Sequence, residues 1–186
     1  MVAITFPIPT EAQEIVFGKD TYMNELQTQQ AKLATDTAYM SLALEEAKKA
    51  LELDEVPVGA ILVWEGKGIV ARAHNTRESG KNALGHAELS AIDAACKRLG
   101  GWRLHKATLY VTLEPCLMCT GAILSARIKR VVYGAPDPKA GGMGGLCDMR
   151  TLGFTHTPEV TVGVCENECK GLLDEFFVRL RERKKK

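Results

Sequence analysis

Four short apolar runs, rich in β-branched residues, constrain the fold of this chain more than any other feature. Glycines separate the first two runs, in Glu65-Gly66-Lys67-Gly68, which favours a tight hairpin and two antiparallel strands. Helical patterns separate the later runs, and this alternation of strand and helix implies parallel neighbours. The sequence therefore predicts a layered α/β domain. The runs are VPVGAILV (56–63), GIVARAH (68–74), ATLYVTL (107–113) and RVVYGA (130–135).

Two longer helices are predicted from apolar residues that recur every three or four positions. The first is expected to begin at Thr35 or Asp36, which are good N-cap residues, and to end near Asp54. The second is closed by Gly100 and Gly101. The positions expected to face the core are Met40, Leu44, Ala47 and Leu51 in the first helix, and Leu89, Ile92, Cys96 and Leu99 in the second.

Three further elements complete the predicted domain. Pro115 is expected to open a short helix that runs through Arg127, and a weak strand is expected at residues 159–164. A final helix begins at about Asn167 and is followed by a basic tail. The residues of this helix expected to face inward are Leu173, Phe177 and Leu180.

The length of 186 residues predicts one globular domain. We expect residues 36–186 to form this domain. Residues 1–35 show no sustained periodicity and are interpreted as an N-terminal extension of unknown role, helical in part from Tyr22. The hydrophobic fraction of 46% and the charged fraction of 25% exclude disorder throughout the chain.

The sequence contains no apolar run of the roughly 18 residues that a membrane span needs, so no membrane partner is expected. Its first residues lack a basic region and carry Glu11, Glu14 and Asp20, so we expect no signal peptide and a cytoplasmic location. In that compartment the six cysteines are kept reduced. Their spacing therefore indicates metal binding or catalysis before disulfides.

The overall charge does not by itself indicate a nucleic-acid partner. The 24 basic residues nearly balance the 23 acidic ones, whereas nucleic-acid-binding domains are often strongly basic. Attraction for phosphate therefore has to be local. Basic residues cluster at Arg127, Lys129 and Arg130 and in the tail (179–186), while Glu45, Glu46, Glu52, Asp54 and Glu55 make the first helix acidic.

His86, Cys116 and Cys119 form a predicted zinc site. They occur in the strings GHAEL and EPCLMC, and one histidine with two cysteines supplies the three protein ligands of a catalytic zinc, which leaves the fourth position for water. Both cysteines are expected at a helix N-terminus, where the positive end of the dipole favours thiolate. Glu88 can reach the same cavity without binding the metal, and a free carboxylate beside zinc-bound water can carry a proton.

Each half of this pattern has a less specific interpretation. A lone Cys-x-x-Cys could be a redox motif or half of a structural zinc site, and His-x-Glu is common by chance. In this order, with about thirty residues between them, the two halves match the zinc-deaminase signature. The other cysteines and histidines lack such support: Cys96, Cys165 and Cys169 are interpreted as buried residues, and His74, His105 and His156 as surface or loop residues. The glycine-rich segment 137–146 is interpreted as a flexible loop.

Together with these motifs, several longer strings make the chain similar to the bacterial tRNA-specific adenosine deaminases over roughly residues 38–183. The resemblance implies a three-layer α/β/α fold with a mixed central sheet, as in cytidine deaminases. It implies one Zn²⁺ per subunit held by His86, Cys116 and Cys119, with Glu88 as the proton shuttle. The strings are EVPVGAILV, HNTRE, WRLHKATLYVTLEPC, SARIKRVVYGAPDPKAG and ECKGLLDEFFVRLR.

The same resemblance implies a substrate and an assembly. Hydroxide would attack C6 of the wobble adenosine in the anticodon stem-loop of an arginine tRNA, releasing ammonia and forming inosine, in a homodimer. Asn75 would hydrogen-bond the purine, and the backbone around Ala87 would line its pocket. We also hypothesise that Phe177 and Arg179 contact the anticodon stem; a buried phenylalanine face with a solvated charged face explains the same pattern equally well.

Two alternative functions remain at this point. The first keeps the chemistry and changes the substrate to a free base or nucleotide, such as cytosine, deoxycytidylate or guanine, because these deaminases share the zinc motifs. The second is a catalytically silent, zinc-bearing RNA-binding subunit. Glu88 argues against the silent subunit, because such a protein does not need a proton shuttle.

Overall fold

The computed structural model describes residues 11–183. The chain divides into two compact units, one ending at Thr35 and the other beginning at Asp36, and helix α1 (Glu11–Glu52) crosses this boundary. The sheet and the remaining helices belong to the second unit. Within residues 11–183, no helix is long and apolar enough to span a membrane.

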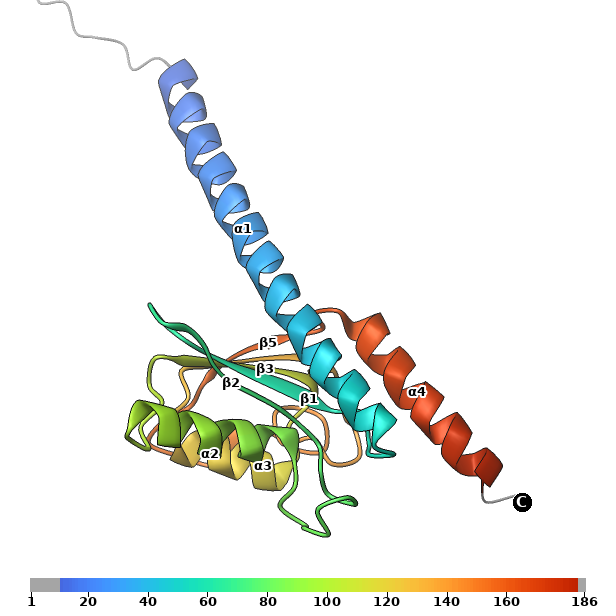
Figure 1. Cartoon of the computed structure of the whole chain (residues 1–186). Helices are drawn as coiled ribbons and strands as arrows, with labels where there is room; N and C mark the ends of the chain where they lie inside the picture. The colour runs from blue at the N-terminus through green and yellow to red at the C-terminus, as the bar shows by residue number, and fades with distance from the viewer. Residues whose placement is uncertain (1–10, 184–186) are drawn as a thin grey trace, which may run out of the picture. The chain divides into compact units, whose positions relative to one another are not determined.

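A five-stranded mixed sheet forms the centre of the second unit (Figure 1). The spatial order of its strands is β2-β1-β3-β4-β5. β1 pairs antiparallel with β2 and β3, whereas β3, β4 and β5 run parallel. This pairing confirms the predicted hairpin and the predicted parallel neighbours. The strands are β1 (Gly59–Trp64), β2 (Gly68–His74), β3 (Ala107–Leu113), β4 (Arg130–Ala135) and β5 (Glu159–Val162).

Helices cover both faces of this sheet. α2 (Ala87–Leu99) and α3 (Leu117–Ser125) lie on one face, and α4 (Glu166–Arg183) lies on the other with the part of α1 that follows Asp36 (Figure 1). Successive residues of β3 face opposite layers: Leu109 joins the core under α2 and α3, and Tyr110 joins the core under α1 and α4. Because side chains alternate between two covered faces, most positions of the strand are apolar. The three-layer α/β/α fold is confirmed.

The start of the first helix differs from the prediction. α1 does not begin at Thr35 or Asp36, nor at Tyr22, but at Glu11. Asp36 is buried, and its carboxylate accepts hydrogen bonds from the guanidinium of Arg130 at 2.8 and 2.6 Å and from the hydroxyl of Tyr110 at 3.0 Å. The N-cap prediction was wrong because this side chain binds the sheet instead of a helix end.

Gly59 allows α1 to approach the sheet closely. A Cβ atom on Gly59 would lie 2.0 Å from the carbonyl oxygen of Ala43 and 2.4 Å from the amide nitrogen of Ala47. Any larger residue at the start of β1 would therefore push the helix away from the sheet. Met40, Leu44 and Ala47 face this contact and are buried, as predicted.

The inner faces of two other helices differ from the prediction. In α2, the fully buried residues are Ala87, Ala91 and Ala95, while the predicted stripe of Leu89, Ile92, Cys96 and Leu99 is only partly buried. Small residues let this helix lie close to the sheet, so that the larger side chains flank the contact. In α4, Leu173 and Leu180 are half-buried, but Phe177 is 43% exposed and does not face the core.

Candidate active site

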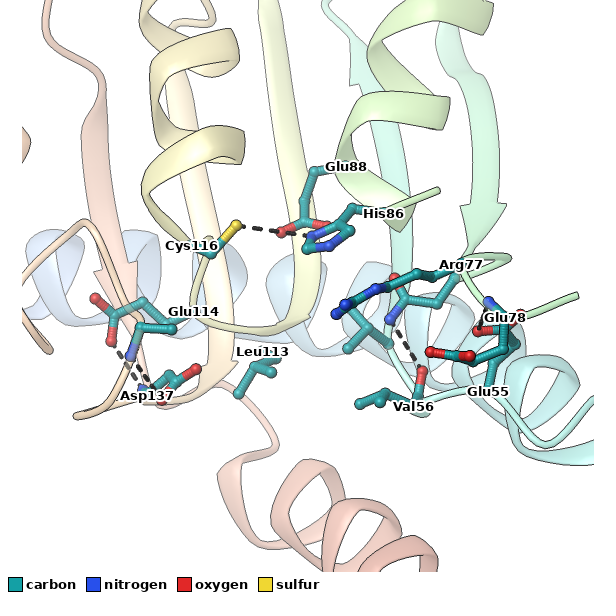
Figure 2. A pocket seen from close by; sticks show the side chains of 13 residues that line it. Glu55, Val56, Arg77, Glu78, His86, Glu88, Leu113, Glu114, Cys116 and Asp137 are labelled. Carbon is teal, nitrogen blue, oxygen red and sulfur yellow. Dashed lines mark hydrogen bonds between the residues drawn. The ribbon is translucent and has the colours of Figure 1, made fainter. Parts of the chain in front are cut away.

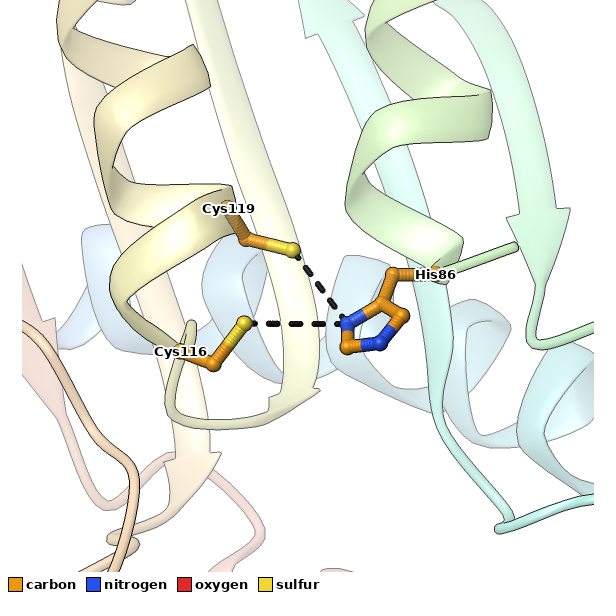
Figure 3. A group of neighbouring side chains, drawn as sticks. All are labelled: His86, Cys116 and Cys119. Carbon is orange, nitrogen blue, oxygen red and sulfur yellow. Dashed lines mark hydrogen bonds between the residues drawn. The ribbon is translucent and has the colours of Figure 1, made fainter. Parts of the chain in front are cut away.

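The three predicted metal ligands meet where two helices begin (Figure 3). His86 directly precedes α2, Cys116 directly precedes α3, and Cys119 lies in the first turn of α3. Nδ1 of His86 lies 3.5 Å from Sγ of Cys119 and 3.7 Å from Sγ of Cys116, and the donor atoms of all three residues lie within 4.8 Å of one another. Tetrahedral zinc with ordinary bond lengths separates nitrogen and sulfur ligands by about 3.6 Å. The donor set and its spacing therefore fit zinc.

The helix carrying the cysteines begins later than predicted. Pro115 and Cys116 both precede α3, and Cys116 is its N-cap residue with an extended backbone (φ −67°, ψ 172°). The side chain of Cys116 makes no capping hydrogen bond, so its sulfur is free to turn toward His86 (Figure 3). The helix ends at Ser125, where the prediction extended it to Arg127.

Hydrogen bonds among these three residues favour the thiolate form of Cys116. Contacts with Cys119 and His86 lower the pKa of Cys116 to about 4, in spite of its partial burial. The pKa of Cys119 is raised by its hydrogen bond to Cys116 and by burial, and the contact with Cys116 raises the pKa of His86. The site thus carries a negative sulfur beside a second buried thiol. Such an arrangement attracts a thiophilic cation.

Glu88 lies in the first turn of α2, two residues after His86, and is 3% exposed. Its Oε2 atom has no hydrogen-bond partner among residues 11–183. Burial raises the pKa of this carboxyl to about 6. A buried, unpartnered carboxylate oxygen is rare in a folded protein and indicates that a ligand or water completes the site.

A pocket opens beside the metal ligands (Figure 2). Its wall combines the histidine, one cysteine and Glu88 with apolar residues and with charged residues from four connecting segments. This mixture of a few directed polar groups and apolar surface is typical of a small-molecule or base-binding site. The lining residues are Glu55, Val56, Val58, Asn75, Arg77, Glu78, His86, Glu88, Leu113, Glu114, Cys116, Asp137 and Ala140.

The predicted substrate-binding residue Asn75 lines this pocket and also orients Ala87. Its Oδ1 accepts a hydrogen bond from the amide of Ala87 at 3.0 Å, and its Nδ2 donates one to the carbonyl of Val56 at 3.1 Å. Ala87 is fully buried and follows His86 directly. Asn75 therefore connects the end of β2 to the beginning of the helix that carries the site.

Phe177 and Arg179 lie apart from the metal ligands, on α4. Phe177 contacts Phe176 edge to face, with ring centroids 5.3 Å apart, and it lines a second cavity with Leu113, Asp137 and Lys139 among others. Arg179 pairs with Glu175 along its own helix. Part of the predicted basic cluster at residues 179–186 is therefore neutralised.

The second predicted basic cluster is also reduced. Arg130 is buried and paired with Asp36, and Lys129 lies 3.8 Å from Glu65. In the acidic group, Glu46 and Glu55 are buried and bound within the fold. These residues are predicted to form surface clusters because they lie close together along the chain. In the fold, Arg130 and Lys129 instead meet Asp36 and Glu65, which are distant in sequence.

Most of the other cysteines and histidines have ordinary structural surroundings. Cys169 is buried as expected, whereas Cys96 and Cys165 are only partly buried. His105 is exposed. His74 and His156 are partly buried and hydrogen-bonded to Glu46 and to the carbonyl of Ile128, respectively, so their interpretation as surface or loop residues was incomplete.

Comparison with known proteins identifies a family. Residues 33–135 match the family model of the cytidine and deoxycytidylate deaminase zinc-binding region. The chain is 53% identical over 154 residues to the tRNA-specific adenosine deaminase of Bacillus subtilis, covering 82% of this chain and 95% of that protein. A solved structure from studies of A-to-I editing by tRNA:A34 deaminases superimposes with a TM-score of 0.70 at 46% identity, covering 74% of this chain and 99% of that one.

A guanine deaminase from Nitrosomonas europaea shares the fold. Its structure superimposes with a TM-score of 0.66 at 22% identity, over 75% of this chain and 83% of that one. At this identity the likeness concerns architecture alone. It does not extend to the substrate.

Proposed function

We propose that this chain, which belongs to the tRNA-specific adenosine deaminases, deaminates adenosine 34 of an arginine tRNA. Its family is that of the cytidine and deoxycytidylate deaminase zinc-binding region. The products are inosine at that position and ammonia, and one water is consumed. The observation that carries this proposal is the His86, Cys116 and Cys119 donor set beside the buried Glu88, whose Oε2 has no hydrogen-bond partner among the described residues.

His86, Cys116 and Cys119 would hold one Zn²⁺ per subunit. Bound zinc makes hydroxide available near neutral pH, because it lowers the pKa of its water to about 7. Glu88 would accept a proton at its free Oε2 and return it to the leaving nitrogen. Its burial keeps that oxygen away from bulk solvent, and its raised pKa suits both directions of transfer.

Asn75 and Ala87 would place the base. The side chain of Asn75 uses its Oδ1 and one Nδ2 donor within the fold, and the second Nδ2 proton remains for a purine acceptor. The amide of Ala87 is bound to Asn75, so the backbone at this point would be a fixed part of the pocket wall. Phe177 and Arg179 would contact the anticodon stem-loop, with the aromatic ring offering a stacking surface for an unstacked base.

The same proposal includes a homodimer in the cytoplasm. Apolar side chains that an interface between two copies would cover are exposed on α3 and after β4, namely Leu117, Met118, Leu146 and Leu152. Because its proposed substrate is tRNA, the protein would act in the cytoplasm. The relatives named for this activity are bacterial.

Replacing Glu88 tests the catalytic part of the proposal. We expect Glu88→Ala to retain zinc, because none of the three ligand atoms is changed, and to lose about 100-fold to 10,000-fold in kcat. Zinc content by mass spectrometry and inosine formation on a transcribed arginine tRNA measure the two effects. Glu52→Ala, at an exposed position of α1, is the matched control. Near-normal inosine formation by Glu88→Ala would refute the proton-shuttle role.

A further inference from the structure

Two buried carboxylates line the pocket without belonging to the metal site. Glu55 is 1% exposed and Glu114 is 2% exposed, and neither is among the metal-ligand group formed by His86, Cys116 and Cys119. Glu55 lies just before β1 and Glu114 directly follows β3. Both are therefore fixed to the rigid sheet, on opposite sides of the pocket in Figure 2.

Glu114 binds the glycine-rich segment 137–145. Its Oε2 accepts a hydrogen bond from the amide of Asp137 at 2.9 Å, and its Oε1 accepts hydrogen bonds from the amides of Met143 at 3.0 Å and Gly145 at 2.9 Å. Three amides from one loop thus converge on one side chain. Backbone donors thus occupy three of the roughly four acceptor positions of this buried carboxylate.

The close approach of this segment to Glu114 requires glycines. A Cβ on Gly141 would lie 2.3 to 2.5 Å from the carboxylate atoms of Glu114, and one on Gly145 would lie 2.1 Å from the carbonyl oxygen of Asp137 and 2.6 Å from Oε2 of Glu114. The segment also binds the residues just before α3, because the amide of Gly142 donates a hydrogen bond to the carbonyl of Pro115 at 2.8 Å. The glycines therefore allow the backbone to close around Glu114, and the interpretation as a merely flexible loop is replaced.

Glu55 holds the opposite wall in the same way. Its Oε1 accepts hydrogen bonds from the amide of Ser79 at 2.6 Å and from the hydroxyl of Ser79 at 2.8 Å, and its Oε2 accepts one from the amide of Glu78 at 3.1 Å. Burial alone would raise the pKa of Glu55, but these donors lower it below 4.5. The carboxylate is thus ionised and fully engaged at neutral pH.

The two bound loops each supply part of the pocket wall. Arg77 and Glu78 come from the loop held by Glu55, and Asp137 and Ala140 come from the loop held by Glu114. We propose that Glu55 and Glu114 are positioning residues, which hold these two loops in place so that the substrate meets a preformed pocket. This inference rests on the proposed deaminase function and assigns neither residue a part in the chemical step.

Steady-state kinetics on an anticodon stem-loop RNA test the proposal through the separate effects on KM and kcat. In Glu114→Gln an amide NH₂ faces backbone donors, so at least one of the three hydrogen bonds is lost. We expect KM to rise about tenfold or more, the loss typical of a charged hydrogen bond. We expect kcat to remain within about threefold, because His86, Cys116, Cys119 and Glu88 are unchanged, and zinc content to be that of the wild type.

Glycine variants test the same contact without altering the carboxylate. Gly141→Ala should raise KM in the same way, because the three atoms nearest a Cβ at Gly141 all belong to the Glu114 carboxyl group. The double variant with Glu114→Gln should show less than the product of the two effects, because both act through one contact. Gly171→Ala is the matched control, since a Cβ at Gly171 meets nothing within 4 Å.

On the opposite wall, Ser79→Ala removes one hydrogen bond at an exposed residue and should produce a smaller rise in KM.

Three results would overturn the positioning role. These are an unchanged KM in folded Glu114→Gln and Ser79→Ala, a fall in kcat at constant KM, and loss of zinc from these variants. Failure of the proposed function has a different signature, because the wild type itself would then leave the RNA unchanged. The same variants would in that case be measured on the free base that the wild type deaminates, and the positioning role would be decided by KM for that base.

Discussion

Asp36 joins α1 to the sheet through its buried carboxylate, which accepts hydrogen bonds from Arg130 at 2.8 and 2.6 Å. Its type and its place before an apolar pattern predict an N-cap, and this prediction is local. The residue instead binds Arg130 and Tyr110, which lie 94 and 74 positions away. Glu55 and Glu114 are similar: the sequence shows the acids, but not the loop amides that they bind. His86, Cys116 and Cys119 were predictable because metal chemistry restricts residue type and spacing.

The buried pair of Asp36 and Arg130 gives a stability prediction. We expect Asp36→Asn to lower the free energy of unfolding by about 3 kcal/mol, because the buried guanidinium of Arg130 loses its counter-charge. Urea unfolding at constant m-value measures this change. Asp93→Asn is the control: it removes an exposed i,i+4 pair with Lys97, which should cost less than about 0.5 kcal/mol. Equal losses in the two variants would contradict the structural role of Asp36.

At the scale of elements, the apolar patterns located the central strands well but missed the start of α1. β3 and β4 have the predicted bounds, since a strand covered on both faces is largely apolar along its length. The inner face of α2 was less predictable. Hydrophobicity favours Leu89 and Ile92, but the sheet accepts the smaller Ala91 and Ala95, because the distance between helix and sheet decides which side chains fit. That distance is a property of the packed domain and not of the segment.

The proposed metal ligands lie where α2 and α3 begin, and this position leads to a prediction about zinc binding. We expect Cys119→Ser to lose zinc and deaminase activity, because a hydroxyl is a weak zinc ligand. Cys147→Ser, at an exposed cysteine outside the ligand set, should retain both. Chelation of the wild type should lower its melting temperature, since bound metal stabilises the folded state by mass action. Full zinc content in Cys119→Ser would show that the ligand set is wrong.

Glu46 connects α1 to the end of β2 and makes this junction sensitive to acid. Its carboxylate binds Lys49 at 2.7 Å and His74 at 3.2 Å. Burial alone would raise the pKa of Glu46, but these contacts lower it below 4.5. The stability that Glu46 contributes is therefore present above pH 4.5 and is lost as the pH falls through the lower pKa of the folded state.

Glu46→Gln should accordingly be less stable than the wild type near neutral pH, and the difference should shrink as the pH falls through the lowered pKa of Glu46. Denaturant unfolding at a series of pH values measures it. Glu45→Gln changes the neighbouring residue, which is exposed and 3.8 Å from Arg72, and should show little difference at any pH. A difference between Glu46→Gln and the wild type that grows on acidification would contradict the assignment.

At the scale of the whole molecule, the near balance of 24 basic and 23 acidic residues does not exclude an RNA substrate. Much of that charge is paired within the fold, as in Arg130 with Asp36 and Arg183 with Asp54. The pocket itself combines Arg77 with several carboxylates. Selectivity would therefore come from the shape of a pocket for one unstacked base more than from general attraction to phosphate.

The three layers were predictable from the alternation of elements together with the family resemblance, and the position of the site followed from two motifs. The pocket walls were not, because they depend on how the segments around Ser79 and Gly145 fold back onto Glu55 and Glu114. Loops of this kind have no periodicity, so their path is determined by partners elsewhere in the chain.

The central claim is that the substrate is adenosine 34 of a tRNA. Nucleoside analysis by mass spectrometry tests it most directly, on transcribed arginine tRNA incubated with the purified wild-type protein, in parallel with free guanine, cytosine and deoxycytidylate. We predict inosine in place of adenosine at the wobble position, at a rate that free bases and nucleotides do not approach. Unchanged adenosine in the tRNA, together with release of ammonia from guanine, cytosine or deoxycytidylate, would contradict the claim.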